Sequence, residues 1–353
     1  MIRTLLAADP RATVAVRSSA SKQVFDKALG LGGPEVSDVR SRVEVTSAVI
    51  DTGMVQFDSL RLDEEATRRE ATLFYDSMGE LVSREVDYLR RCGASLVVGD
   101  IPPLAFAAAA AAGLPSMAIG NFTWDWIYED LADSASLVAQ VRAAYRHATR
   151  ALRLPMWGGF ADLDPITEDI PFIARQSHRT PAEIRQSIGV PLERKMVLLS
   201  FGGFGLADLN VAALAHLNGY TIVTTDLHER ERAPGIHVVS EEALYASGLR
   251  YEDLVHAADV VVTKPGYGII SEAIANDTAL LYTSRGRFRE YDVLVREMPR
   301  YLRAEFIEQD DLIAGRWGDA IERLLARPVP SAKAALNGAA VAANRILALG
   351  AGR

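Results

Sequence analysis

The chain has 353 residues, which is more than one compact domain usually holds and favours two domains. Its apolar share of 49% suffices for two cores, and its net charge of −8 gives no electrostatic support to a surface that follows nucleic-acid phosphates. The single cysteine, Cys92, excludes an internal disulfide and a cysteine-built metal site, which is typical of a cytoplasmic protein.

The sequence shows no membrane-spanning segment. Met1 to Pro10 lacks the basic head and long apolar core of a secretory signal. The apolar run Ile101 to Ile119 is interrupted by Pro102, Pro103, Gly113 and Pro115, which favours a buried helix and strand over a membrane span. Peripheral membrane contact and the oligomeric state stay open.

The beginning of the chain is unusual for an α/β domain. Met1 to Ala8 is typical of a helix, and Ala12 to Val16 is typical of a strand. A doubly wound domain normally opens on a central strand whose glycine turn holds the ligand. We therefore expect that this first strand and its loop are absent from the chain. The alternative is a domain that begins at a helix.

The first half continues as alternating strands and helices. A strand followed by a helix and another strand at this spacing predicts a parallel crossover unit. The strands are expected at Val43 to Val45, Ser95 to Asp100 and Ser116 to Gly120, and the helices within Leu62 to Arg91, at Leu104 to Ala112 and at Leu131 to Arg153.

A group of aromatic and polar residues follows the strand Ser116 to Gly120. Open α/β sheets bind ligands at the carboxyl ends of their strands. Flat indole rings stack on sugar faces while polar side chains hydrogen-bond the hydroxyls, so we predict an acceptor surface formed by Asn121, Trp124, Asp125 and Trp126. The alternative is that the two tryptophans anchor the following helix.

A stretch rich in proline and glycine, Leu154 to Arg179, is the best candidate for a linker. Its Asp162-Leu163-Asp164 triplet lies in a loop between prolines and does not follow a strand, so we expect no metal site. Thr180-Pro181-Ala182-Glu183 is a capping box that marks a helix start. We predict an N-terminal domain at 1–160, a linker at 161–180, a C-terminal domain at 181–330 and a terminal helix at 331–353 that can pack back toward the N-terminal domain.

The second half predicts a second doubly wound sheet. Its strands are expected at Met196 to Ser200, Tyr220 to Thr225, Ile236 to Val239, Asp259 to Lys264, Leu280 to Thr283 and Glu305 to Ile307. Helices are expected from Asp208, at Tyr251 to Ala257, near Asp292 to Met298, at Asp311 to Ala326 and at Ala332 to Leu349.

The strand Asp259 to Lys264 and the turn Pro265-Gly266-Tyr267-Gly268 carry the strongest functional signal. The run of β-branched residues indicates a strand buried on both faces, and the glycines let the backbone approach a phosphate at the start of the next helix. Glu272, one turn into that helix, is placed to accept hydrogen bonds from ribose hydroxyls. The alternative is that the glycines serve close packing and that Glu272 is an ordinary first-turn acid.

A second glycine turn, at Gly202, Gly203 and Gly205, follows the first strand of the second half. Two such turns in one sheet favour a diphosphate site. The chain has no P-loop motif, so nucleotide hydrolysis of that kind is not supported. Arg285, Arg287 and Arg289 follow the next strand, where they either offset the diphosphate charge or form a solvated loop.

These motifs resemble the donor domain of GT-B glycosyltransferases, notably the bacterial N-acetylglucosaminyltransferase that makes lipid II. The shared residues are Phe201-Gly202-Gly203, Lys264 to Gly268 and Ser271-Glu272. A closer resemblance, over nearly the whole chain, is to the glycosyltransferase-like module at the amino end of plant arabinokinases. It is carried by Asp100 to Pro103, Asn121 to Tyr128, Lys264 to Glu272 and Phe288-Arg289-Glu290.

The resemblance implies a GT-B fold, in which two Rossmann-like doubly wound domains face each other across a cleft. Glu290 and Tyr291 stand where the lipid II enzyme has two glutamines that face the donor. Because of this difference, the resemblance does not identify the donor. Relatives begin with a strand and a G-H-G-x-G-H-like loop, whose histidines would supply a general base and which is missing here. The implied donor-binding residues are Gly202, Gly203, Phe204, Lys264, Gly266, Tyr267, Gly268, Ser271, Glu272, Arg287, Glu290 and Tyr291.

The resulting hypothesis is a metal-independent glycosyltransferase that uses a nucleotide-sugar, expected to be UDP-linked, without a cofactor. Asp125 is the candidate base, because none of the six histidines matches a catalytic position. A nucleotide-sugar-binding or regulatory module without turnover is the main alternative, and a nucleotide-sugar epimerase is a third. The sequence identifies neither the sugar nor the acceptor, and it does not set a retaining or inverting outcome.

Overall fold

The computed structural model describes residues 1–30, 37–201, 209–225 and 236–351. The chain divides into two compact units. The first unit consists of Met1–Val55, Asp63–Ile173 and Ala335–Arg353, and the second of Gln56–Leu62 and Ala174–Ala334. The division at residue 173 falls inside the stretch predicted as a linker, and a short segment of the first half belongs to the second unit.

The first unit holds its parallel strands in two sheets. One sheet pairs β1 with β2, and the other has the order β3-β4-β5-β6. The strands are β1 (Val14–Ser18), β2 (Val43–Ser47), β3 (Val97–Gly99), β4 (Ser116–Gly120), β5 (Arg150–Arg153) and β6 (Thr167–Asp169). The residues of β4 are all buried, whereas those of β1 and β3 are mostly half-buried. Among the described residues, no strand pairs one of these two sheets with the other.

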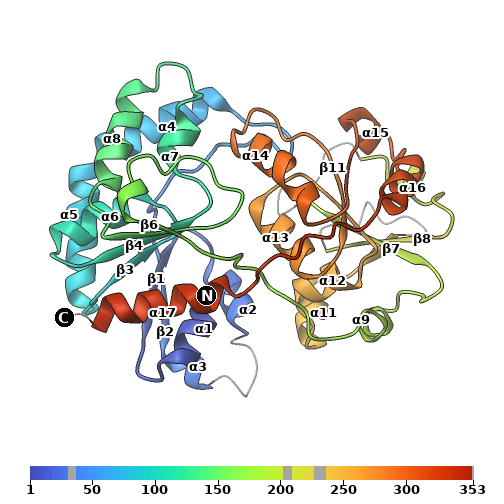
Figure 1. Ribbon diagram of the computed structural model, residues 1–353, viewed down its shortest axis with the longest axis horizontal. Coiled ribbons are helices and arrows are strands. Elements are labelled where there is room, and N and C mark those ends of the chain that lie inside the picture. Colours follow the sequence, from blue (N-terminus) through green and yellow to red (C-terminus); the bar gives the residue numbers. More distant parts are fainter. Residues whose placement is uncertain (31–36, 202–208, 226–235, 352–353) are drawn as a thin grey trace. The chain divides into compact units, whose positions relative to one another are not determined.

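Helices of the first unit come from both ends of the chain. The last helix packs against the first one (Figure 1). The helices are α1 (Ile2–Ala8), α2 (Lys22–Leu29), α3 (Ser37–Ser41), α4 (Glu64–Asp76), α5 (Met78–Arg91), α6 (Pro103–Ala111), α7 (Trp124–Tyr128), α8 (Ala135–Tyr145), the 3₁₀ turn η2 (Asp164–Ile166) and α17 (Gly338–Ala351).

Three predictions for this unit were wrong in detail. The helix expected at Leu131 to Arg153 is α8, which ends at Tyr145. The last four residues of the expected range, Arg150–Arg153, form β5 instead. Pairing with β4 buries Ala151 and Leu152, so tertiary packing overrides their helix propensity. The expected linker contains β6, a strand of the same sheet. The long helix expected within Leu62 to Arg91 is two helices, α4 and α5, that meet at Ser77.

The second unit is built on one parallel sheet with the order β12-β11-β10-β7-β8-β9. Its strands are β7 (Lys195–Ser200), β8 (Tyr220–Thr224), β9 (Ile236–Val238), β10 (Val260–Thr263), β11 (Ala279–Tyr282) and β12 (Ala304–Phe306). Its helices are α9 (Pro181–Ser187), α10 (Val211–Leu214), α11 (Glu241–Ala246), α12 (Tyr251–Ala257), α13 (Tyr267–Ala275), α14 (Glu290–Glu297), the 3₁₀ turn η4 (Met298–Arg300), α15 (Gln309–Ile313) and α16 (Gly318–Ala326).

Both faces of this sheet are covered by helices, as the β-branched strand pattern predicts. Alternate residues of β10 enter two separate cores. Val260 and Val262 pack with residues of α16, and Val261 packs with residues of α9, α11 and α12. The helix expected at Asp311 to Ala326 is instead two helices, since the chain turns at Gly315 with φ +74°.

The two glycine turns predicted to bind a diphosphate follow neighbouring strands. β7 and β10 pair in parallel, with Ser200 opposite Thr263 at their carboxyl ends. The turn after β10 therefore begins at the same edge of the sheet as the chain that leaves β7. Gly202, Gly203, Phe204 and Gly205 themselves lie outside the described residues.

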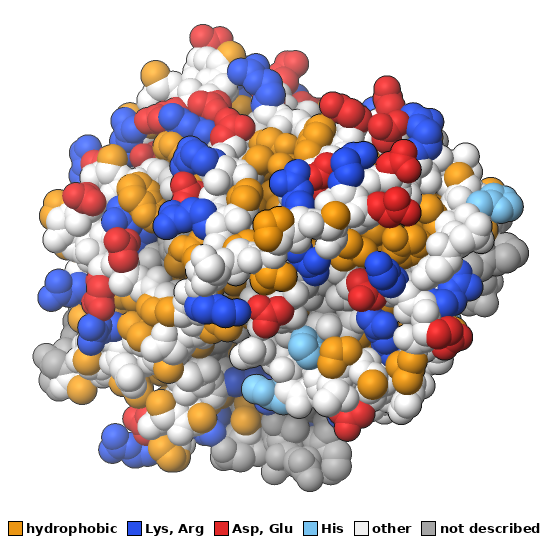
Figure 2. All heavy atoms as spheres, turned by 45° about the vertical axis from the view of Figure 1, so that its right-hand side comes forward, with side chains coloured by type: hydrophobic (Ala, Val, Ile, Leu, Met, Phe, Trp, Pro, Cys, Tyr) orange, Lys and Arg blue, Asp and Glu red, His pale blue; other side chains and the backbone are white. Residues whose placement is uncertain are grey.

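Charges of both signs are distributed over the described surface. On the face shown in Figure 2, Lys and Arg side chains are interspersed with Asp and Glu side chains. Within the described ranges, no helix is both long enough and apolar enough to cross a membrane.

The start of α9 offers a stability prediction. The Thr180 hydroxyl accepts a hydrogen bond from the Glu183 N–H at 3.3 Å, and the Glu183 carboxylate accepts one from the Thr180 N–H at 2.9 Å. Thr180→Ala removes this cap and is expected to destabilise the second unit by about 1 kcal/mol. Urea unfolding followed by a probe in the second unit measures the change. Ser187→Ala, at the end of the same helix, is the control, and equal midpoints for both variants would contradict the prediction.

Candidate functional site

The first turn of α13 lies directly after β10 and is open above its glycines. Gly266 is the N-cap of this helix. A Cβ added at Gly268 would meet no atom within 4 Å, and one added at Gly266 would meet only the Arg285 guanidinium, at 3.8 Å. The N–H groups at the start of a helix favour an anion, so this turn provides space and polarity for a phosphate group.

Two cationic side chains stand beside this turn. Arg285, whose side chain is 11% exposed, donates from Nη1 to the Pro265 carbonyl at 2.9 Å and stacks over the Phe288 ring at 4.2 Å. Lys264 is half-buried, and its Nζ donates to Gln56 Oε1 at 3.1 Å. Burial and the nearby Arg285 lower the pKa of Lys264 to about 8. The two positive charges repel each other, and a bound anion would reduce this repulsion.

Among the three arginines predicted to follow β11, the one that the structure brings to the turn is Arg285. Arg287 is exposed, and its role stays a prediction. Glu290 begins α14 and is buried, with Oε2 at 3.6 Å from Arg285 Nη1. Tyr291 is half-buried, and burial raises its pKa to about 12.

Glu272 lies inside the second unit and does not point to bulk solvent. It is 6% exposed, and its Oε1 accepts a hydrogen bond from Arg175 Nε at 2.5 Å. Arg175 also pairs with Glu252 of α12 at 3.6 Å. Burial raises the pKa of Glu272, and Arg175 opposes that rise. Within the described residues Glu272 Oε2 has no hydrogen-bond donor, so one carboxylate oxygen is available to a ligand.

The remaining predicted donor residues on α13 have partly internal roles. Ser271 is buried, and its hydroxyl donates to the Gly268 carbonyl at 2.9 Å. Burial and the charge of Glu290 raise the pKa of the half-buried Tyr267, so it is a neutral phenol at neutral pH. Ser271 therefore stabilises the first turn, whereas Lys264, Arg285 and Glu272 present charge around it.

The predicted acceptor residues occupy the carboxyl end of β4 in the first unit. Trp124 stacks on Tyr128 with 5.4 Å between ring centroids. Trp126 lies over Gly158, where any Cβ would come within 2.3 Å of the indole. Asn121 is buried, and its backbone carbonyl accepts the Gly158 N–H at 2.9 Å. This packing favours anchoring, the alternative reading, for Trp126.

Asp125, the predicted base, is 3% exposed and paired with a cation. Its Oδ2 accepts a hydrogen bond from Arg142 Nε at 3.1 Å. Arg142 also contacts Glu129 and lies 3.4 Å from Asp162 Oδ2. The Asp162 of the acidic triplet is thus held by arginines. Asp125 is therefore engaged in a buried ion pair, and its role as a base stays a prediction.

Asp51 is a second carboxylate of the first unit, one that the sequence did not single out. Asp51 follows β2, is half-buried, and accepts the Thr52 N–H at 2.8 Å. The indole N–H of Trp124 faces it without the geometry of a full hydrogen bond. Burial raises the pKa of Asp51 to about 6, and the Asp100 carboxylate adds to that rise. No Lys or Arg of the described chain forms an ion pair with Asp51. A lone aspartate in a loop carries no sequence motif, so only its surroundings reveal it.

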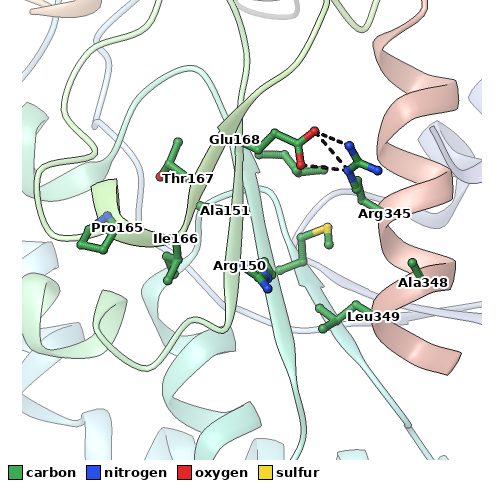
Figure 3. Close-up of a pocket in the computed structure, with 11 residues that line it drawn as sticks. Arg150, Ala151, Pro165, Ile166, Thr167, Glu168, Arg345, Ala348 and Leu349 are labelled. Atoms are coloured by element: carbon green, nitrogen blue, oxygen red, sulfur yellow. Dashed lines mark hydrogen bonds and ion pairs between the residues drawn. The ribbon is translucent and has the colours of Figure 1, made fainter. Parts of the chain in front are cut away.

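A pocket of about 470 Å³ lies elsewhere in the first unit (Figure 3). Its residues include Met117, Arg150 and Thr167 at the amino ends of β4, β5 and β6, together with residues of α17. The Glu168–Arg345 ion pair lies at its rim, with 2.7 Å between Oε1 and Nη2. The predicted site residues stand at the carboxyl ends of strands and do not line this pocket.

Comparison with known proteins gives one relative in sequence and several in structure. No protein-family model matches the chain. The chain is 27% identical to L-arabinokinase of Arabidopsis thaliana over 325 residues, which is 89% of this chain and 30% of that protein. The chain therefore spans less than a third of the length of that relative.

Solved structures align with almost the whole chain. CalG4, the calicheamicin glycosyltransferase, has a TM-score of 0.58 at 15% identity and covers 99% of this chain and 90% of its own. The glycosyltransferase SnogD from Streptomyces nogalater has a TM-score of 0.52 at 18% identity, with coverages of 97% and 96%. Arabidopsis thaliana UGT89C1 complexed with UDP has a TM-score of 0.54 at 14% identity, with coverages of 98% and 90%. The chain therefore has the GT-B fold of glycosyltransferases, as the sequence motifs predicted.

Proposed function

We propose that this chain is a glycosyltransferase that takes a sugar from a nucleoside diphosphate, expected to be UDP, and passes it to an acceptor hydroxyl. The observation that carries the proposal is the convergence of Lys264, Arg285 and the first turn of α13 at one edge of the sheet. The free oxygen of Glu272 lies one turn further along the helix. Cations, helix N–H groups and a carboxylate in this order suit the diphosphate and ribose of a nucleotide-sugar.

The reaction follows from these groups. The acceptor oxygen forms a bond to the anomeric carbon, the bond from that carbon to the phosphate oxygen breaks, and the nucleoside diphosphate leaves with the electron pair. Lys264, Arg285 and the α13 N–H groups stabilise the charge on the departing diphosphate. The proposal includes no metal ion and no cofactor.

The acceptor proton needs a base, and the structure favours Asp51 over Asp125. Asp125 is occupied by Arg142, whereas Asp51 has no cationic partner among the described residues and has a pKa of about 6. A base with a pKa near the working pH combines the correct protonation state with a driving force for proton transfer. We therefore assign proton removal to Asp51 and leave Asp125 a structural role.

A nucleotide-sugar-binding module without turnover is the second candidate. The observation that favours it is the match to only 30% of a protein named L-arabinokinase. In that case the donor would bind at Lys264, Arg285 and Glu272, and no sugar would be transferred.

The experiment that separates the candidates has two readouts. The full chain is incubated with UDP-, dTDP- and GDP-sugars and a panel of hydroxyl acceptors, and both nucleotide release and the sugar product are measured. Calorimetry gives donor binding in parallel. Binding with transfer supports the proposal, binding without transfer or hydrolysis supports the binding module, and a changed sugar stereocentre would indicate an epimerase. Absence of binding to every nucleotide-sugar would contradict all three.

A further inference from the structure

Residues 56–62 form a small hairpin in the second unit, although Val55 and Asp63 on either side belong to the first. Gln56 and Leu62 form an antiparallel bridge. At the tip, the Asp58 carboxylate accepts the N–H groups of Leu60 and Arg61 at 2.8 and 2.9 Å. These bonds fix the turn, so the 56–62 hairpin is an ordered element.

The 56–62 hairpin is anchored beside the carboxyl ends of β7 and β11. Leu60 is 6% exposed and belongs to the core formed by β7, β10 and β11. The buried Ser59 hydroxyl donates to the Phe201 carbonyl, directly after β7, at 2.8 Å. Gly286, after β11, has φ +74° and would place a Cβ 3.4 Å from the Leu60 carbonyl oxygen. The 56–62 hairpin therefore has a fixed position at the edge of the sheet where the diphosphate is proposed to bind.

Lys264 links the 56–62 hairpin to the proposed donor site. Gln56 Oε1 accepts the hydrogen bond from Lys264 Nζ, and no described group accepts from Gln56 Nε2. The Asp58 carboxylate is close enough to counter the fall in the Lys264 pKa. The 56–62 hairpin thus places the Gln56 amide N–H groups and the Asp58 carboxylate close to Lys264.

The contacts of Glu272 and of Lys264 lead to different elements of the second unit. Glu272 contacts Arg175, which also reaches Glu252 of α12, so the ribose side faces α12. Lys264 precedes the helix and faces Gln56. In the binding mode inferred here, a diphosphate would lie over the first turn of α13 with its ribose at Glu272, and its other substituent would extend toward Lys264 and the 56–62 hairpin. That substituent is the sugar to be transferred.

We propose that Gln56, at the base of the 56–62 hairpin, recognises the donor sugar by donating a hydrogen bond from Nε2 to one of its hydroxyls. The inference rests on the proposed function and adds a specificity residue to it. A neutral amide fits a sugar hydroxyl, whereas the Asp58 charge disfavours a further phosphate on this side. The acidic residue also sets the shape of the turn that presents Gln56.

The test compares a nucleoside diphosphate with its sugar conjugates on three proteins. Calorimetry measures the affinity of the wild type, Gln56→Ala and Phe57→Ala for the nucleoside diphosphate that binds best among UDP, dTDP and GDP, and for its glucose, galactose and N-acetylglucosamine conjugates. Phe57 is the control, since it is adjacent to Gln56 in the hairpin and is 66% exposed. Thermal unfolding of each variant verifies its fold.

In Gln56→Ala we expect the preferred nucleotide-sugar to bind about 3- to 10-fold more weakly, which is the loss of one hydrogen bond, and the nucleoside diphosphate to change by less than about 2-fold. Phe57→Ala should match the wild type with both ligands. If Gln56→Ala binds the nucleoside diphosphate and the nucleotide-sugar more weakly by the same factor, Gln56 acts only through Lys264 and the proposal is overturned. Unchanged affinity for both ligands would also overturn it. If the wild type binds none of the nucleotides, the proposed function itself fails.

Discussion

Replacing Glu272 by glutamine is expected to weaken binding of the nucleoside diphosphate by about 10- to 100-fold, because hydrogen bonds to a charged carboxylate are worth about 1.5–3 kcal/mol. Oε1 of Glu272 is held by Arg175, and Oε2 is left for the ribose hydroxyls. Glutamine keeps the shape of the side chain and can still accept from Arg175, so the loss reports on the charge and not on a cavity. Calorimetric titration with UDP measures the change.

Arg175→Gln is the matched control for this prediction. It removes the other half of the same ion pair, while the Glu272 carboxylate remains. If Glu272 matters only as the partner of Arg175, both variants will weaken nucleotide binding equally. The ribose role predicts that Arg175→Gln stays within about 3-fold of the wild type, because the hydrogen bonds to the ligand persist. Unchanged affinity in Glu272→Gln would remove Glu272 from the donor site.

Replacing Asp51 by asparagine is expected to lower the transfer rate by about 10²- to 10⁴-fold, the usual contribution of a general base. Nucleotide binding should be unaffected, because the donor residues belong to the second unit. The measurement is kcat for nucleotide release with the acceptor that supports turnover. Asp125→Asn is the comparison, and it is expected to lower stability more than kcat, since it leaves Arg142 without its buried partner.

The pH dependence gives the same assignment an independent test. Asp51 must be ionised to accept a proton, so the wild-type rate is expected to fall as pH drops through about 6, its raised pKa. The charged and titratable groups around it are Asp100, Tyr75, Tyr128 and Tyr145, and burial keeps the three phenols neutral in this range. The acid limb should disappear in Asp51→Asn. An acid limb that persists there would assign the titration, and the base, to another group.

The elements that sequence predicts best are those with a strong local pattern. Val260 to Thr263 form a buried strand because four consecutive β-branched residues fit a sheet covered on both faces. The capping box at Thr180 begins α9 where predicted. Arg150 to Arg153 show the limit: alanine, leucine and arginine favour a helix, and only pairing with β4 makes them a strand.

The candidate site divides in the same way. Lys264 stands out because it lies between a buried strand and a glycine turn, and Glu272 because it follows that turn in sequence. Their partners do not, since Gln56 is 208 positions from Lys264 and Arg175 is 97 positions from Glu272. No local pattern links such distant residues. Asp51 likewise gains its raised pKa from burial beside Asp100, which only the folded first unit provides.

The central claim is that Lys264, with Arg285, binds a diphosphate at the end of β10. The most direct test is calorimetric titration of the full chain with UDP at pH 8 in two buffers of unequal ionisation enthalpy. A bound anion raises the pKa of Lys264 from about 8, so binding should take up about half a proton at pH 8 and weaken as pH rises further. Lys264→Met should bind more weakly and without this uptake. Binding that is independent of buffer and pH in the wild type, or no binding of any nucleoside diphosphate, would contradict the account.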